Sequence, residues 1–245
     1  LIVDLGQNVA GWLRVRLKGR KGERVTLRYS EILRSDDPEQ LYVANLRLAR
    51  CMDAYTPASD GWFEWEPQFV IHGFRFVEIS GADLSAMPSE RNFAGIVAYD
   101  EMKSTGTFSC SDEILNLMHE NTARGLRGNY RGMPTDCPQR DERMGWLGDR
   151  STGCYGEAFI YDVENLYRKW SLDIQESMRE DGCISDVSPR YWTLWNEDVT
   201  WPAALFGAVD MLWRQFGNEQ VVRDRYDAMK KWVGFILGKK VRDGI

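Results

Sequence analysis

The chain has 245 residues, of which 43% are hydrophobic, and a formal net charge of −6. This length allows one or two domains with a substantial core. The chain contains no stretch of roughly 18 apolar residues, no signal-peptide pattern and no basic stripe. The sequence therefore argues against a membrane protein and against a nucleic-acid-binding protein.

Cysteine and histidine are sparse. The five cysteines are an odd number without metal-ligand spacing, so we expect free and mostly buried thiols rather than disulfide bonds: Cys51, Cys110, Cys137, Cys154 and Cys183. Only His72 and His119 are available for imidazole chemistry. We expect no metal site and no cofactor, although a structural calcium ion is left open.

The first hundred residues have the pattern of a β domain. Leu13, Val15 and Leu17 alternate with basic residues, which is typical of a half-buried strand. A turn at residues 18–22 leads to a second alternating run at 25–30, and the two runs are predicted to form a hairpin. Further strands are expected at 73–81 and 93–100. Short strands with Gly and Pro between them favour an antiparallel β-sandwich.

From about residue 103 the pattern becomes helical. Ser111 is predicted to cap a helix, with Asp112 and Glu113 in the first turn and an apolar stripe that includes Ile114. Leu117 and Met118 continue this stripe. Apolar residues at three- and four-residue steps predict further helices over 159–174, 205–216 and 222–236. The last two should form a helical hairpin at residues 217–218.

The most unusual stretch is "DCPQRDERMGWLGD", residues 136–149. If the chain is helical after Pro138, then Glu142, Trp146 and Asp149 share one helix face. Asp136 would approach this face from the preceding loop. The glycines at 145 and 148 would remove bulk beside the face, so that another group could come close.

Several carboxylates around one indole are typical of a carbohydrate site. Sugars offer hydroxyl groups to charged acceptors and C–H faces to aromatic rings. Cleavage of a glycosidic bond needs one protonated and one ionised carboxyl group. The alternative is a surface helix with incidental ion pairs, because charged residues are mostly exposed.

A second aromatic cluster, "RYWTLWNEDVTWP" at 190–202, supports the carbohydrate interpretation. Trp192, Trp195 and Trp201 surround Glu197 and Asp198 in a predicted connection between helices, where functional residues concentrate. The alternative is that some of these indoles pack beneath the loop.

The stretch "PTDCPQRDERMGWLGD" resembles the signature of the bacterial α-L-rhamnosidases of glycoside hydrolase family 78. Other segments agree in order: "DLGQNVAGWLRVRLKGRKGERVTLRYSEIL", "FVIHGFRFVEISG", "GTFSCSDEILNLMHENT" and "WPAALFGAVDMLWRQFGN". The resemblance covers nearly the whole chain. It implies an antiparallel β-sandwich domain, residues 1–102, followed by part of an (α/α)6 barrel, residues 103–245. It also implies hydrolysis of terminal α-L-rhamnose from rhamnosides with inversion.

The resemblance also implies roles for individual residues. Glu142 matches the family's general acid, and Asp136, Trp146 and Asp149 match residues that hold the rhamnose. Arg140 and Asp141 lie inside the motif, and Arg140 is assigned to charge pairing or to the pocket wall. We expect Trp192, Trp195 and Trp201 to line the same pocket. His72 lies in the "HGFR" strand and is expected to be structural, as is His119.

The family's general base is another Glu much further towards the C-terminus, beyond the last residue here. Glu197 and Asp198 are the only local substitutes. Both ends of the chain have the pattern of truncated termini. Because the base is expected beyond the last residue, we expect the 245 residues alone to be inactive. The expected partner is a rhamnose-containing oligosaccharide or glycoside, in the cytoplasm or periplasm of a bacterium. Oligomeric state is left open.

Two alternatives are kept. One is a related (α/α)6 glycosidase that acts on another sugar. The other is a non-catalytic carbohydrate-binding protein that uses the tryptophans as a platform.

Overall fold

The computed structural model describes residues 1–85 and 88–243 of the chain. These residues divide into two compact units. The β unit comprises Leu1–Tyr99 together with Arg127–Asn129 and Cys137–Arg143. The helical unit comprises Asp100–Leu126, Tyr130–Asp136 and Met144–Ile245. An antiparallel β region followed by a helical region, as predicted, is confirmed.

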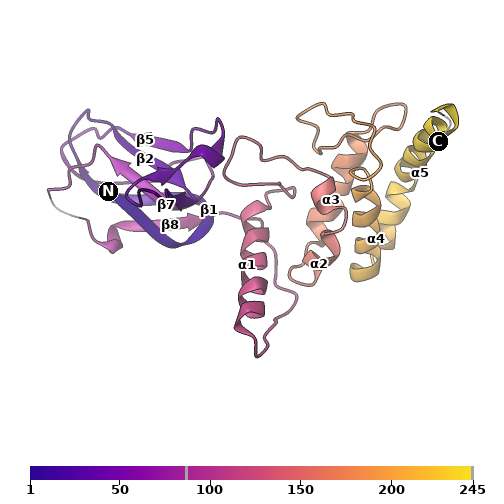
Figure 1. The fold of residues 1–245 in the computed structure, drawn as a ribbon, viewed down its shortest axis with the longest axis horizontal. Coiled ribbons are helices and arrows are strands. Elements are labelled where there is room, and N and C mark those ends of the chain that lie inside the picture. The colour runs from indigo at the N-terminus through magenta and orange to yellow at the C-terminus, as the bar shows by residue number, and fades with distance from the viewer. Residues whose placement is uncertain (86–87, 244–245) are drawn as a thin grey trace. The chain divides into compact units, whose positions relative to one another are not determined.

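The β unit contains a sheet in the order β5-β2-β7-β1-β6, with β8 also paired to β1. All the pairings are antiparallel. A small second sheet joins β3 and β4. The described strands are β1 (Ile2–Gly19), β2 (Val25–Ser30), β3 (Ile32–Leu33), β4 (Leu41–Tyr42), β5 (Met52–Tyr55), β6 (Gly61–Trp65), β7 (His72–Ser80) and β8 (Phe93–Val97). Figure 1 shows the principal strands side by side.

The predicted alternation along β1 is confirmed, because Leu13, Val15 and Leu17 are buried while Arg14 and Arg16 are exposed. The predicted hairpin of residues 13–17 with 25–30 is wrong. Strand β7 lies between β1 and β2 and pairs with both. A central strand can bond to a neighbour on each side, and β7 is rich in the aromatic and β-branched residues that suit this position.

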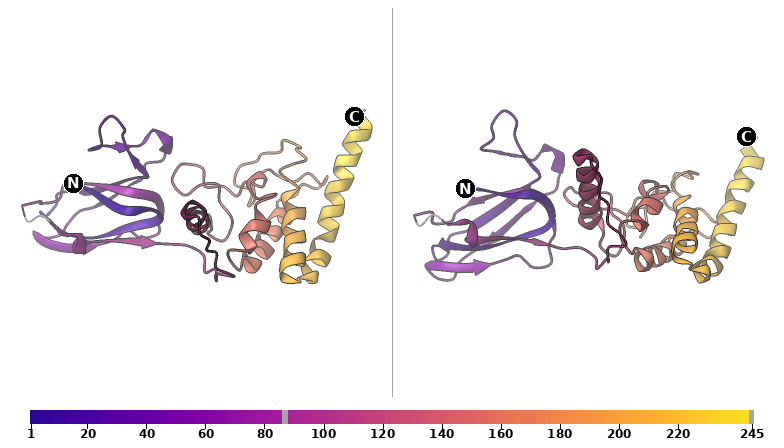
Figure 2. Two further views of the ribbon diagram at one scale, coloured as in Figure 1. Left: turned by 60° about the horizontal axis from the view of Figure 1, so that its bottom comes forward. Right: turned by 90° about the horizontal axis from the view of Figure 1, so that it is seen from below.

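The helical unit contains the α-helices α1 (Glu113–Asn129), α2 (Cys154–Ala158), α3 (Glu164–Glu176), α4 (Ala204–Phe216) and α5 (Glu219–Asp243). Helix α1 ends within a stretch assigned to the β unit. The predicted hairpin of the last two helices is confirmed: α4 ends at Gly217, which has a φ of 67°, and α5 begins two residues later. Glycine reaches this left-handed conformation without steric cost. Figure 2 shows α4 and α5 side by side.

Two helix predictions need correction. Asp112, not Ser111, caps α1, because its carboxylate accepts the backbone N–H of Ile114 at 2.8 Å. The helix predicted over 159–174 begins only at Glu164, and Phe159 ends the short helix α2 as an exposed residue. The stripe of α1 that includes Ile114 is exposed within the described residues.

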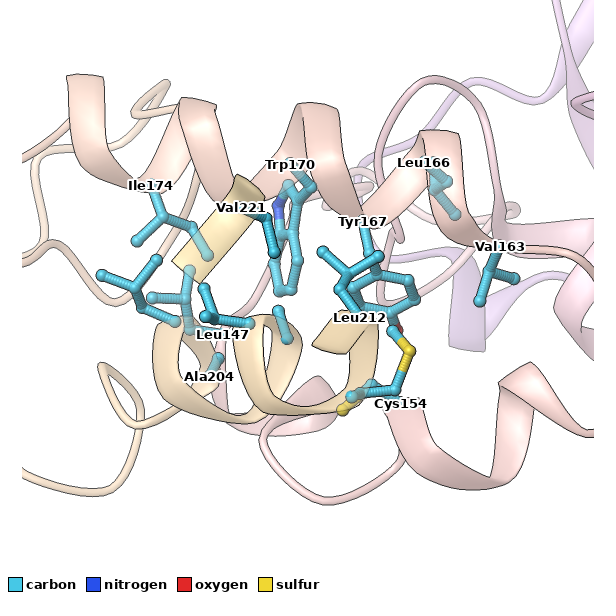
Figure 3. Close-up of a cluster of buried hydrophobic side chains, with 14 of the residues drawn as sticks. Leu147, Cys154, Val163, Leu166, Tyr167, Trp170, Ile174, Ala204, Leu212 and Val221 are labelled. Atoms are coloured by element: carbon cyan, nitrogen blue, oxygen red, sulfur yellow. The ribbon is translucent and has the colours of Figure 1, made fainter. Parts of the chain in front are cut away.

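The core of the helical unit packs α3 against α4. Trp170, Tyr167 and Ile174 point from α3 towards Leu212 and Ala204 of α4 (Figure 3). The indole N–H of Trp170 donates to the carbonyl oxygen of Ser188 at 2.8 Å, so this buried donor is satisfied. Leu147 is part of the same core, which fixes the end of the acidic stretch.

Four of the five cysteines are buried, as expected, and Cys110 is exposed. All five are free. His72 is buried, stacks on Tyr29 and forms a 3.0 Å hydrogen bond with Asp53. No helix in the described part of the chain has the length and apolarity needed to cross a membrane.

Candidate active site

The acidic stretch 136–149 is a loop, and the predicted helix after Pro138 is wrong. The backbone N–H of Asp136 donates to the carbonyl oxygen of Met144 at 2.9 Å. The N–H of Met144 donates in return to Asp136 Oδ1 at 2.7 Å. Arg143 has a φ of 56°, which a helix does not accommodate. Residues 137–143 therefore form a loop closed at its neck by Asp136 and Met144.

The predicted site residues fall in both units. Arg140, Asp141 and Glu142 belong to the β unit. Asp136, Trp146 and Asp149 belong to the helical unit, as do Trp192, Trp195 and Trp201. Each group is described within its own unit.

Glu142 is held by two guanidinium groups of the β unit. Its Oε2 accepts from Arg47 Nη1 and from Arg140 Nε, each at 2.8 Å. The Glu142 side chain is only 10% exposed, whereas that of Arg47 is 53% exposed. Charge-assisted bonds of this length are strong and directional. They fix the orientation of the carboxylate that the sequence assigns as an acid.

Asp141 is exposed and accepts the backbone N–H of Leu48 at 3.3 Å. Arg143 donates to the carbonyl oxygens of Arg140 and Ile71, at 3.2 and 2.7 Å. Acidic residue 141 and basic residue 143 thus bond to backbone on either side of Glu142. The bonds to Leu48 and Ile71 attach the C-terminal part of the loop to the rest of the β unit.

In the helical unit, the end of the acidic stretch pairs through its backbone with the segment that precedes the aromatic cluster. Trp146 and Val187 form an antiparallel bridge. Leu147 N–H donates to the carbonyl oxygen of Asp186, and Ser188 N–H to that of Gly145, each at 2.9 Å. The stretch 145–147 therefore pairs with 186–188, immediately before the aromatic cluster of 190–202.

Two tryptophans of the cluster contact the acidic stretch. The rings of Trp146 and Trp192 meet edge to face, with 6.4 Å between their centroids. Trp201, which is 37% exposed, lies against Gly148. Gly148 begins the 3-10 turn Gly148–Arg150, which carries the exposed residue Asp149. The glycines at 145 and 148 do allow close approach, but the approaching groups are Ser188 and Trp201 of the protein itself.

Trp195 has a different environment. The guanidinium groups of Arg179 and Arg190 lie 5.2 and 5.3 Å from its ring centroid, within the range of cation–π contacts. Cations thus already occupy positions against this ring. A role for Trp195 in sugar binding stays a prediction.

The two local carboxylates considered as a base are also engaged. Glu197 pairs with Arg179 at 3.4 Å and with Lys239. Asp198 accepts from the backbone N–H and the hydroxyl of Thr200. The Thr200 hydroxyl is the main cause of a lowered pKa for Asp198.

A buried ionic network begins at Arg150, the residue that follows Asp149. Arg150 donates to Glu157 Oε1 at 2.8 Å and to the carbonyl oxygen of Thr135 at 3.4 Å. The hydroxyl of Tyr167 donates to Glu157 Oε2. Burial first, and then the charge of Glu157, raises the pKa of Tyr167 well above its ordinary value, so this phenol stays neutral. The network ties the turn of Asp149 to the residue before Asp136.

Asp186 is a buried carboxylate that the sequence analysis did not identify. Its Oδ2 accepts from Asn196, and its Oδ1 is buried without a hydrogen-bond partner among the described residues. Burial is the main cause of a raised pKa for Asp186. Asp186 precedes Val187, and its carbonyl oxygen accepts the N–H of Leu147, so it helps to hold Trp146 in place.

A groove of about 590 Å³ in the helical unit lies between residues 100–103 and the start of α3. Asp100, Asp162 and Lys169 are among its lining residues. None of the predicted site residues lines it. The candidate site is therefore defined by the residues of the two motifs and not by this groove.

Comparison with known proteins matches both parts of the chain to domains of one family. Residues 1–99 match the bacterial alpha-L-rhamnosidase concanavalin-like domain, and residues 103–244 match the bacterial alpha-L-rhamnosidase 6 hairpin glycosidase domain. An alpha-L-rhamnosidase of Formosa agariphila is 37% identical over 234 residues, which is 95% of this chain and 25% of that protein. One of Streptomyces avermitilis is 34% identical over 244 residues, which is 100% of this chain and 23% of that protein.

Solved structures agree. The alpha-L-rhamnosidase from Dictyoglumus thermophilum matches 98% of this chain and 26% of its own, with a TM-score of 0.92 and 35% identity. The Streptomyces avermitilis enzyme complexed with L-rhamnose matches 96% of this chain and 22% of its own, with a TM-score of 0.90 and 35% identity. The chain thus spans about a quarter of the length of these relatives. By its two family domains and its relatives, the chain belongs to the bacterial α-L-rhamnosidases.

Proposed function

We propose that the protein hydrolyses terminal α-L-rhamnose from rhamnosides with inversion, and that Glu142 is the general acid. Family membership over both domains supports the reaction class, and a relative at 35% identity has been solved with L-rhamnose. The observation that supports Glu142 as the acid is its carboxyl group, which is only 10% exposed and is oriented by Arg47 and Arg140 at Oε2.

In the proposed reaction, Glu142 protonates the oxygen of the departing group while a water molecule attacks the anomeric carbon. Arg47 and Arg140 stabilise the carboxylate that remains after the proton has left. Asp136 and Asp149 accept hydroxyl groups of the sugar, and Trp146 offers its ring to a C–H face. Arg140 and Asp141 complete the wall near the acid, and Trp192 and Trp201 extend the aromatic surface.

We propose that neither Glu197 nor Asp198 is the base. In an inverting enzyme the base lies roughly 6.5–9.5 Å from the acid, with room for a water molecule between them. Glu197 is engaged by Arg179 and Lys239, and Asp198 caps its own turn at Thr200. The 245 residues then contain the acid without its base, and they do not hydrolyse a rhamnoside by themselves.

The test uses the protein as encoded by its gene and 4-nitrophenyl α-L-rhamnoside. Glu142→Gln should lower kcat by roughly 10²–10⁴-fold with little change in binding of L-rhamnose, because a general acid contributes about this much. Glu64→Gln changes an exposed residue of the β unit and serves as the matched control. A Glu142→Gln enzyme with an unchanged rate would remove Glu142 from this role.

Two further measurements separate the remaining possibilities. NMR of the first-formed rhamnose reports its anomer, and retention of configuration would contradict inversion. Turnover by the 245-residue chain alone would contradict the proposal that it lacks the base. Binding of L-rhamnose without hydrolysis of any nitrophenyl glycoside would favour the carbohydrate-binding alternative, whereas cleavage of another glycoside would favour a related glycosidase.

A further inference from the structure

The loop 137–143 is seated on the β unit along its whole length. Gly73 of β7 lies directly beneath it: a Cβ there would come within 2.8 Å of Pro138 Cγ and 3.0 Å of the backbone nitrogen of Gln139. The thiol of Cys51 donates to the carbonyl oxygen of Gln139 at 3.0 Å. At the far end, Arg143 donates to the carbonyl oxygen of Ile71. The surface that carries the proposed acid is thus built by the β unit.

Arg47 comes from a short loop of this surface. It follows the 3-10 turn Ala44–Leu46, and its φ is 56°. Positive φ is uncommon for a residue other than glycine, and such strain collects at functional sites. The next residue, Leu48, gives its N–H to Asp141. The loop therefore contacts two successive acidic residues of 137–143, one through a side chain and one through backbone.

The contact of Arg47 with Glu142 is specific in its geometry. Arg47 Nη1 and Arg140 Nε both bond to Oε2 of Glu142, at 2.8 Å. An oxygen that accepts two N–H bonds is not the one that carries a proton. In the proposed acid step the proton is carried on Oε1, and the orientation of the carboxyl group, which Arg47 and Arg140 fix at Oε2, decides whether that proton reaches the substrate.

We propose that Arg47 is a positioning residue for the acid step, and that it acts through Glu142. This inference rests on the proposed function of Glu142. As the bond between the anomeric carbon and the leaving oxygen breaks, its electron pair goes to that oxygen, which takes the proton from Glu142 Oε1. The negative charge left on Glu142 is stabilised by Arg47. The β unit then contributes to the chemistry as well as to the fold.

Leaving groups of different basicity test this inference in the protein as encoded by its gene. The leaving group of a 2,4-dinitrophenyl rhamnoside departs as a stable phenolate and needs little protonation. The more basic leaving group of a 4-methoxyphenyl rhamnoside must be protonated by the acid. Arg47→Met should lower kcat/KM for the methoxyphenyl substrate by roughly 10–100-fold, the value of one charge-assisted hydrogen bond. It should leave the dinitrophenyl substrate within about twofold. Arg47→Lys, which keeps the charge but loses the guanidinium geometry, should lie between.

Arg34→Met is the matched control, because Arg34 is an exposed arginine of the β unit in a surface ion pair with Asp36. It should affect neither substrate. Equal losses on both substrates with Arg47→Met would assign Arg47 a structural role and overturn the inference, as would no loss on either. Glu142→Gln run on the same pair keeps the two proposals apart. If Glu142→Gln shows the leaving-group dependence and Arg47→Met does not, the positioning role of Arg47 is wrong and the assignment of Glu142 as the acid stands. If Glu142→Gln shows no leaving-group dependence, the assignment of Glu142 as the acid and the role of Arg47 are both wrong.

Discussion

Trp201 lies where a side chain of residue 148 would be. A Cβ at Gly148 would come within 2.4 Å of Trp201 Cε2, although the two residues are more than fifty positions apart in the sequence. Gly148 is not among the residues with positive φ, so its backbone accepts any L-residue. Glycine is required at this position because the indole of Trp201 comes too close to leave room for a Cβ. This contact joins the turn of Asp149 to the aromatic cluster.

Gly148→Ala should therefore act through Trp201. We expect the added methyl group to displace the indole, to lower the free energy of unfolding by about 1–3 kcal/mol as overpacking does, and to raise KM. KM for a nitrophenyl rhamnoside and urea unfolding report the two effects. Gly234→Ala is the control, because Gly234 lies inside α5 with nothing within 4 Å of its Cβ position. An unchanged KM for Gly148→Ala would contradict a role for Trp201 in sugar binding.

The tryptophans of the second cluster should differ in their effects. Trp192 meets Trp146 edge to face, whereas Trp195 has arginine side chains against its ring. Trp192→Ala should raise KM by roughly tenfold through the loss of aromatic contact. Trp195→Ala should mainly lower the melting temperature, because cation–π contacts with Arg179 and Arg190 are lost. A larger rise in KM for Trp195→Ala than for Trp192→Ala would reverse this assignment.

Local periodicity predicted much of the fold because it reports burial directly. Leu13, Val15 and Leu17 alternate in the sequence and are buried in the structure. Gly217 marks the end of α4, and no other residue type adopts its conformation so readily. The hairpin of β1 with β2 was wrong because strand order depends on β7, which comes some forty residues later. No local pattern reports which distant strand will insert.

The sequence did not predict the local geometry of the acidic stretch. The roles that residue types and the family resemblance assign to Glu142 and Trp146 stay predictions, whereas the helix predicted to carry both residues is wrong. Asp136 and Met144 close a loop instead, through a side-chain contact that competes with helix formation. Arg47 could not be found from the sequence at all. It is one of many arginines, and it lies 95 residues from Glu142 along the chain.

Breaking the buried ion pair of Arg150 and Glu157, next to Asp149 in the sequence, should lower stability. Glu157 is 4% exposed, and Arg150 is mostly buried beside it. Glu157→Gln leaves a buried guanidinium without its counter-charge, which should destabilise the protein by about 3–5 kcal/mol. Glu219→Gln breaks an exposed i,i+4 pair with Arg223 and should cost less than about 0.5 kcal/mol. Chemical unfolding measures both, and similar losses would show that the burial of Glu157 carries no special energy.

Tyr167 belongs to the same network, which a double-mutant cycle can show. Its hydroxyl donates to Glu157. Tyr167→Phe and Glu157→Gln should therefore be non-additive by about 0.5–3 kcal/mol, as residues in one network are. Additive losses would separate the tyrosine from the ion pair.

Alkaline pH should destabilise the helical unit through a buried thiol. Burial, and then the charge of Glu157, raises the pKa of Cys154 from 9.0 to about 12. A raised pKa in the folded state means that folding favours the protonated thiol. The stabilisation is complete below pH 9 and is lost as the pH rises from 9 towards 12, with a slope of at most about 1.4 kcal/mol per pH unit.

Urea unfolding between pH 7.5 and 9.0, followed by intrinsic tryptophan fluorescence, measures this dependence before most tyrosines of the unfolded chain ionise. Cys154→Ala should be less stable at pH 7.5, because it leaves a cavity, but its free energy of unfolding should fall less steeply as the pH rises. Cys110→Ala removes an exposed thiol and should keep the slope of the unmodified protein. Burial of Cys183 also raises its pKa, so some dependence will persist in Cys154→Ala. Equal slopes of unfolding free energy against pH in the unmodified protein, Cys154→Ala and Cys110→Ala would contradict this prediction. They would mean that the Cys154 thiol ionises as easily in the folded core as in the unfolded chain, although burial against α4 should disfavour the thiolate.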